Sequence, residues 1–348
     1  MGRSYEPCTV TPGVCRLASF LLRRFVYFAA LVVVATSIAY FLAATQLNPR
    51  SNYQGRNPPP PPAVVDAQLD AINMNDKTPV LERFTIWAGG VVQGDFGRTI
   101  DNGSVNDEMN RRMWVSLRLL LIGSLIGTMV GVLAGAWGAI RQYKFSDQAM
   151  TLLAFVLLST PTVVLAVLVK YAGTWFNRAV GRADDPLVYN TGEMTPGLDP
   201  WSWAGITDRF AHLILPSIVL IIGVNGFAFY SRYQRSAMLD VLGSDFLRTA
   251  QAKGLRRSRA LFKHGLRTAL IPMATFFSYQ FALLFVGATF TEKIFGWHGM
   301  GEWFVDSITR NDVNAAAAIT LFVAVLVPLA GVISDFAYAA LDPRVRVR

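Results

Sequence analysis

The stretch VSLRLLLIGSLIGTMVGVLAGAWGAI, residues 115–140, carries one charged side chain, Arg118, in 26 residues. A bilayer core about 30 Å thick needs roughly 20 mostly apolar residues per helix, so this stretch is long enough to cross a membrane. Five other runs share this character, and the predicted spans are 25–44, 115–140, 149–176, 212–230, 269–290 and 315–340. The chain is 53% hydrophobic and 16% charged, whereas soluble domains carry about 25% charged residues. The sequence therefore predicts an all-α polytopic membrane protein with six transmembrane helices.

Basic residues gather in alternate segments between the spans, and this pattern predicts the orientation. Cytoplasmic loops of membrane proteins carry an excess of Lys and Arg. The segment 231–268 holds nine such residues against two acidic ones, and the two ends of the chain are also basic. We therefore expect a cytoplasmic N-terminal segment (1–24), a first span (25–44), an extracytoplasmic segment (45–114), a core of five spans (115–340) with a cytoplasmic loop at 231–268, and a cytoplasmic tail (341–348).

The formal net charge of +9 could also indicate a nucleic-acid binder. Cationic inner loops are expected of any protein with several spans, so topology explains the charge and nucleic acid is not an expected partner. The sequence contains no GxxxxGK[ST] phosphate loop, no HExxH zinc pair and no GxSxG nucleophile elbow. Two function classes remain, a transport pathway without its own energy source and a membrane-embedded enzyme.

The segment between the first two spans has a composition of its own. Five consecutive prolines at 58–62 cannot donate backbone hydrogen bonds, and they predict a stiff spacer. Residues 63–72 and 79–92 have apolar spacing that is compatible with helices. The segment is therefore expected to form a small ordered cap on the outer face.

The basic loop reads GSDFLRTAQAKGLRRSRALFKHGLRTALIPM at 243–273. Helical propensity continues from 231 to 253, and Gly254 is expected to end that helix because glycine adopts the left-handed conformation. Ser258 is expected to cap a short helix, 259–264, that Gly265 closes. A short helix with one apolar and one basic side either lies on anionic lipid or inserts into a cytoplasmic partner.

Two pieces of this loop, RTAQAKGL at 248–255 and KHGLRTALIP at 263–272, resemble the cytoplasmic EAA loop of ABC importer permeases. The resemblance is to the branch that takes up dipeptides, oligopeptides and nickel, in which Arg248 replaces a glutamate of the general loop. GDFGRTI at 94–100 is similar to the GDFGRS segment of that branch, and DPRVR at 342–346 matches its C-terminal segment. The family's ExxFxWxGxG segment matches Glu292, Phe295, Trp297, Gly299 and Gly301. His298 replaces a usual proline in that segment.

This resemblance implies a type I ABC importer permease fold in a bacterial inner membrane. The implied partners are a second homologous permease, two ATP-binding subunits and an extracytoplasmic substrate-binding protein. ATP and Mg would be bound by the ATP-binding subunits, so no cofactor and no catalytic step is expected in this chain. The implied cargo is a dipeptide or oligopeptide, with a nickel chelate or another small solute as the alternative.

The resemblance also assigns residues to roles. The family's loop forms the coupling helix, which docks in a cleft of the ATP-binding subunit. The residues expected to make that contact are Ala250, Gly254, Leu255, Arg256, Arg257, Leu261, Phe262 and His264. The residues expected at an outer gate or a binding-protein contact are Asp95, Phe96, Glu292, Phe295 and Trp297. The cap at 63–100 is expected to face the binding protein.

Polar side chains inside predicted spans are candidates for function, because they are costly in lipid. Gln280 is expected to face the protein interior, and helical spacing places Phe277, Gln280 and Leu284 on one stripe, with Phe281 beside it. This stripe either lines the translocation path or packs against neighbouring helices. Lys170 is expected to extend to the outer interface in preference to contacting substrate. Asp335 is expected to pair with Arg344 or Arg346 as a structural anchor.

Overall fold

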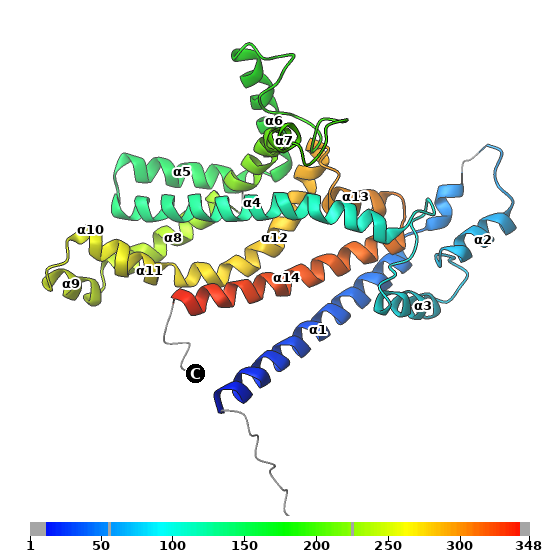
Figure 1. Cartoon of the computed structure of the whole chain (residues 1–348), viewed down its shortest axis with the longest axis horizontal. Helices are drawn as coiled ribbons and strands as arrows, with labels where there is room; N and C mark the ends of the chain where they lie inside the picture. Colours follow the sequence, from blue (N-terminus) through cyan, green and yellow to red (C-terminus); the bar gives the residue numbers. More distant parts are fainter. Residues whose placement is uncertain (1–11, 55–56, 224–225, 342–348) are drawn as a thin grey trace, which may run out of the picture.

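The computed structural model describes residues 12–54, 57–223 and 226–341, and within these ranges it contains helices and one isolated bridge, between Arg98 and Ser104, but no strand. Four long helices are α1 (Pro12–Gln46), α4 (Val105–Ile140), α12 (Ile271–Phe295) and α14 (Val313–Leu341). Figure 1 shows α4, α12 and α14 extending along the length of the molecule, with α1 beside α14. The fold is therefore helical, as predicted.

Four helices are long and apolar enough to cross a membrane, namely 22–46 within α1, α4, α7 (Trp203–Ile222) and α14. The bent pair formed by α5 (Phe145–Ser159) and α6 (Thr162–Ala179) would make five if it counts as one span. These counts apply to the described ranges. They support a chain with several membrane spans, four or five by this count, whereas the sequence predicts six.

The prediction of one continuous helix at 149–176 is wrong. The helices α5 and α6 meet at an angle of 112°, and Thr160 between them has an extended backbone with ψ of 121°. Pro161 explains the break, because a proline ring disfavours the helical conformation of the residue before it. The predicted span 212–230 is also divided, since α7 ends at Ile222 and α8 (Phe227–Leu242) begins after Gly226.

Helices α4 and α8 approach each other closely along a stripe of glycines. Gly123, Gly127, Gly131 and Gly135 repeat every four residues on one face of α4. A Cβ atom at Gly131 would lie 2.6 Å from Cβ of Tyr230, and one at Gly135 would lie 2.3 Å from the carbonyl oxygen of Ser231. Small residues at this spacing let the backbones of membrane helices pack together. This packing brings the backbones of α4 and α8 into close contact.

One end of the molecule carries α2 (Pro62–Ala71) and α3 (Val80–Val92), which confirm the helices predicted at 63–72 and 79–92. A short 3-10 helix (Pro49–Tyr53) leads into them. Tyr40 of α1 stacks on Trp87 of α3 with ring centroids 4.9 Å apart, and both belong to a core cluster that includes Val313 and Ala317 of α14. The cap is therefore packed onto the ends of α1 and α14.

The opposite end carries α9 (Asp245–Ala252), α10 (Arg257–Ala260), a π-helical turn (Leu261–Gly265) and α11 (Leu266–Ala269). Figure 1 places this group and the α2–α3 cap at opposite ends. The predicted loop helices need correction. The helix expected over 231–253 is divided at Gly243 and Ser244 into α8 and α9, because Ser244 is extended and takes the position that caps a new helix.

Two charged side chains in the predicted spans have partners other than those expected. Lys170 donates a hydrogen bond of 2.8 Å to the backbone carbonyl of Ile294 and so ties α6 to α12. Asp335 of α14 forms an ion pair with Arg24 of α1. The partners predicted for it, Arg344 and Arg346, lie outside the described residues, as does the DPRVR segment.

Candidate functional site

The turn between α12 and α13 (Met300–Thr309) contains the segment that matches ExxFxWxGxG. Gly296 ends α12 in the left-handed conformation, with φ of 57°, and His298 also has a positive φ of 50°. The backbone N–H of Trp297 donates a 2.8 Å hydrogen bond to the carbonyl of Glu292. The chain therefore reverses direction within four residues and starts α13 beside the last turn of α12.

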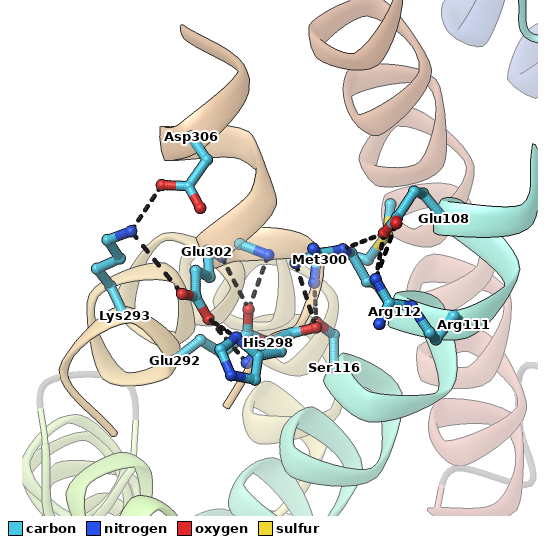
Figure 2. Close-up of polar contacts among 11 residues, drawn as sticks. Glu108, Arg111, Arg112, Ser116, Glu292, Lys293, His298, Met300, Glu302 and Asp306 are labelled. Carbon is cyan, nitrogen blue, oxygen red and sulfur yellow. Dashed lines mark hydrogen bonds and ion pairs between the residues drawn. The ribbon is translucent and has the colours of Figure 1, made fainter. Parts of the chain in front are cut away.

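The Glu292 carboxylate holds this turn together, and Figure 2 shows Ser116 and the start of α13 converging on it. The Ser116 hydroxyl donates to Oε1 at 2.5 Å, and it accepts a hydrogen bond from the N–H of Met300 at 2.7 Å. The N–H groups of Gly301 and Glu302 donate to Oε2 at 2.7 and 3.1 Å. A helix N-terminus presents free N–H groups that suit a carboxylate, so Glu292 caps α13 from the neighbouring helix.

Both glycines of the segment are required by close approach. A Cβ atom at Gly299 would lie 2.5 Å from the Ser116 hydroxyl oxygen and 2.6 Å from the Glu292 carboxyl carbon. A Cβ atom at Gly301 would lie 2.6 Å from the backbone Cα of Thr289. A side chain at Gly299 would displace the Ser116 and Glu292 side chains, and one at Gly301 would push against the backbone of α12, so glycine at both positions lets α13 reach the carboxylate.

The two aromatic residues of the segment are buried. Trp297 donates its indole N–H to the carbonyl of Val115 on α4 at 3.3 Å, and Phe295 packs against the core formed with α6 and α7. Glu292, Phe295 and Trp297 each have at most 2% of their surface exposed. These side chains face the interior of the chain. They could therefore affect a binding protein only indirectly, by holding the turn between α12 and α13, which we call the corner.

Charged side chains surround the corner on its outer side, as Figure 2 shows. Lys293 pairs with Asp306 at 2.6 Å and lies 3.8 Å from Glu302. Glu302 also accepts a 2.8 Å hydrogen bond from the backbone N–H of His298. The residue that replaces the family's proline is therefore held in the turn through its backbone.

The GDFGRTI segment lies beside this corner. The backbone N–H of its last residue, Ile100, donates a hydrogen bond to a second buried carboxylate, that of Asp312. Asp95 is exposed, whereas Phe96 is partly buried against the core cluster around α4 and α14. Asp312 precedes α14, and its two oxygens accept hydrogen bonds from the N–H groups of Ala315 and Ile100 at 3.0 and 2.8 Å. Burial raises the pKa of Asp312 from 3.8 to about 6, against the effect of these hydrogen bonds. This carboxyl group fastens the GDFGRTI segment to α14.

At the opposite end, Gly254 separates α9 from α10 with φ of 91°, which is the left-handed conformation predicted for it. The predicted closure of a helix at Gly265 is wrong. Gly265 is helical, with φ of −64°, and the chain continues through the π-helical turn into α11. Gly265 is buried, and a Cβ atom there would lie at ordinary contact distances from Val241 and Leu247, 3.4 and 3.8 Å.

The residues predicted to contact an ATP-binding subunit divide into two groups. Leu261 is buried with Leu247, Met238 and Ala269, and Ala250 and Leu255 are half-buried against the same cluster. Gly254, Arg256, Phe262 and His264 are exposed. The side chain of Arg257 lies outside the described part of the structure. Leu261 therefore belongs to the packing that holds the loop, while the exposed group forms its free surface.

The predicted stripe on α12 is partly described. Gln280 is 4% exposed, and its side-chain oxygen has no hydrogen-bond partner among the described residues. Phe277 packs beside the core cluster of α4 and α14. The side chains of Phe281 and Leu284 lie outside the described part of the structure. Gln280 faces the protein interior, as predicted, and the choice between lining a path and packing stays open at this point.

Three features of these sites were absent from the sequence predictions. Ser116 lies 176 residues before Glu292, and sequence spacing gave no signal for their contact. Asp312 was also missed, although an acidic residue directly before a helix is a capping signal. The glycine stripe of α4 carries a recognisable GxxxG spacing. Among the described residues no group of three or more His, Cys, Asp or Glu side chains could hold a metal ion.

Comparison with known proteins gives a consistent result. Residues 127–347 match the family model described as "Binding-protein-dependent transport system inner membrane component". The chain is 51% identical over 331 residues to the oligopeptide transport system permease protein OppB of Mycobacterium tuberculosis. The aligned region covers 95% of this chain and 100% of that protein. It is 34% identical to the oligopeptide permease protein AppB of Bacillus subtilis over 80% of this chain and 83% of that protein. It is 33% identical to the dipeptide permease protein DppB of Escherichia coli over 80% of this chain and 85% of that protein.

Proposed function

The chain belongs to the family of inner membrane components of binding-protein-dependent transport systems, in the peptide branch of the ABC importer permeases, and we propose that it forms half of a pathway for peptide import. The observation that carries this proposal is 51% identity to a protein named as an oligopeptide permease, over nearly the whole chain. In this role the chain forms the wall of the path. It performs no chemical step.

Membership of this family implies ATP-binding and substrate-binding partners. The proposed assembly has a second, homologous permease, two ATP-binding subunits that hold ATP and Mg, and one extracytoplasmic binding protein. The proposed topology has six spans, namely α1, α4, the α5–α6 pair, α7 with α8, α12 and α14. Both termini and the α9–α11 end are on the cytoplasmic side, and the α2–α3 cap is outside.

The α9–α11 end is proposed as the coupling surface. Phe246 of α9 is 44% exposed and Phe262 is 66% exposed, and the basic residues Arg248 and Arg256 of the same end are also exposed. An apolar anchor with a charged rim suits a short helix that inserts into a groove of a partner. Because the loop is packed through Leu247 and Leu261 onto α8, a push on α9 would be transmitted along the α4–α8 pair.

The corner around Glu292 is proposed to support the outer gate. It joins α12 and α13 to α4 through Ser116 and Trp297, whose partners are buried. A movement of α4 relative to α12 would therefore have to move α13 as well. In this proposal Asp95 and the α2–α3 cap face the binding protein, and Gln280 is the polar group of α12 nearest the path.

Uptake by the reconstituted complex tests the proposed cargo. Proteoliposomes that contain this chain with its permease partner and ATP-binding subunits should accumulate a radiolabelled tetrapeptide when ATP and the loaded binding protein are present. Unlabelled dipeptides and oligopeptides should compete, and a nickel–histidine chelate should not. Competition by the chelate and not by peptides would favour the alternative cargo. ATP-independent turnover of a substrate by the isolated chain would instead support a membrane-embedded enzyme.

A further inference from the structure

A cavity of about 440 Å³ lies between α4, α5 and α8, close to the end that carries α9–α11. This volume is in the range of small-ligand sites. The lining includes Gly135 and Gly138 from α4, Met150, Thr151 and Phe155 from α5, and Ser231, Arg232, Ser236 and Leu239 from α8. The cavity therefore combines hydroxyl and basic groups with apolar groups, and α5 and α8 each contribute both polar and apolar side chains.

One of its two arginines is already neutralised. Arg235 donates two hydrogen bonds to the Asp147 carboxylate, at 2.6 and 2.7 Å, and the backbone N–H of Tyr143 donates to the same group at 3.0 Å. Asp147 is buried, and Arg235 neutralises its charge. This bidentate pair fastens the start of α5 to α8 and forms one wall of the cavity.

The other arginine remains available for a ligand. The Arg232 guanidinium lies over the Phe155 ring at 4.3 Å and is exposed. Ser231, a residue 6% exposed, lines the same cavity, and its buried hydroxyl has no hydrogen-bond partner among the described residues. An unsatisfied buried hydroxyl costs free energy, and a guanidinium with a neighbouring hydroxyl matches the oxygens of a phosphate group.

The surroundings of the cavity favour a ligand that is part of the bilayer. Next to Phe155, the outward face of α5 exposes Leu152, Leu153 and Val156, as expected of a helix against lipid. Met150 and Leu239 continue this apolar surface into the cavity. Basic pockets between membrane helices near the cytoplasmic surface are suited to anionic lipid headgroups.

We propose that this cavity binds the phosphate group of an anionic amphiphile, with Arg232 pairing with the phosphate beside Ser231. The glycerol and alkyl parts would lie against Phe155 and Met150. A headgroup bound here would connect α5 with α8, and hence with the loop proposed for coupling. The proposal rests on the inward placement of that end in the proposed function. The same phosphate chemistry could be supplied by a lipid or by a soluble phosphate.

Native mass spectrometry of the whole transporter complex tests the site. Complexes taken from nanodiscs of phosphatidylcholine with one quarter phosphatidylglycerol should retain phosphatidylglycerol preferentially. Arg232→Gln should lower that retention at least fivefold, whereas Arg232→Lys should keep part of it. Arg259→Gln is the matched control, since Arg259 is exposed and does not line the cavity, and it should retain the lipid as the wild type does. Displacement of the lipid by millimolar inorganic phosphate would identify a soluble phosphate as the physiological source.

Retention by Arg232→Gln equal to that of the wild type would overturn the proposal, as would equal retention of phosphatidylcholine and phosphatidylglycerol. The proposal would also be overturned if the second permease subunit fills the cavity. In that case a cysteine introduced at Thr151 would cross-link to that subunit, and the complex would retain no lipid there. Peptide uptake measured on the same preparations separates the two proposals. Intact lipid retention with no ATP-dependent peptide uptake would contradict the proposed function and leave the lipid site standing.

Discussion

Gly301 has no room for a side chain, because a Cβ atom there would lie 2.6 Å from the backbone of Thr289. We predict that Gly301→Ala displaces the start of α13 from the Glu292 carboxylate and destabilises the outer end by about 1–3 kcal/mol, the usual cost of overpacking. Gly89→Ala is the matched control, since nothing lies within 4 Å of its added Cβ. Thermal unfolding of the purified complex checks both variants. Equal melting temperatures for the two would show that the corner tolerates a side chain.

Asp312 predicts a pH dependence of stability at the residue scale. Its pKa is raised by burial from 3.8 to about 6. Between these values the unfolded chain loses the proton while the folded chain keeps it, so stability falls as pH rises through about 4 to 6 and then levels off. The full effect is at most about 3 kcal/mol. Asp312→Asn should make this slope in melting temperature between pH 4 and 6 shallower, whatever its absolute stability. A variant with the wild-type slope would assign the effect to another group.

Single residues show how far the sequence could predict these sites. Glu292, Phe295, Trp297 and the glycines were identified together from the resemblance of their segment. Their structural roles depend on Ser116, a partner that is 176 positions distant and follows no periodic pattern. Local chemistry was therefore readable from the sequence, whereas the long-range partner that completes the carboxylate site was not.

At the scale of elements, Gly254 sets the angle between α9 and α10. Its φ of 91° is unfavourable for residues with a Cβ by roughly 1–2 kcal/mol, while nothing lies within 4 Å of an added Cβ. Gly254→Val should therefore lower the ATPase activity stimulated by the binding protein several-fold through backbone strain. Gly254→Asn should retain most of it, because asparagine tolerates the left-handed conformation. Loss of activity in both variants to the same degree would point to a steric contact with a partner in place of backbone strain.

The elements also show why some boundaries could not be predicted. The apolar run 149–176 is continuous in composition, so it suggests one helix, yet Pro161 divides it. The segment 231–253 has good helical propensity throughout, but Gly243 and Ser244 end one helix and begin the next. In both cases the sequence contains the residues that end the helix. The predictions followed overall apolar length or helical propensity and therefore missed the breaks. The cap helices were predicted correctly because proline and turn residues bound them.

For the whole molecule, α4 connects the two ends and packs closely through its glycine stripe against α7 and α8. The outer corner is attached to α4 through Ser116, and the α9–α11 loop is attached to α8 through Leu247 and Leu261. Interfaces packed this closely move as units and do not deform gradually. In the proposed function, this arrangement would let docking at one end change the proposed gate at the other.

The coupling proposal is tested most directly by cysteine cross-linking in the assembled transporter. Arg256 is exposed beside Gly254, and Gln68 is exposed on α2 at the opposite end. With a short bifunctional reagent, Arg256→Cys should cross-link to an ATP-binding subunit and not to the binding protein, and the yield should change when ATP is added. Gln68→Cys should cross-link to the binding protein and not to an ATP-binding subunit. Cross-linking of Arg256→Cys to the binding protein, or of both cysteines to one partner, would contradict the proposal that the two ends face opposite sides of the membrane.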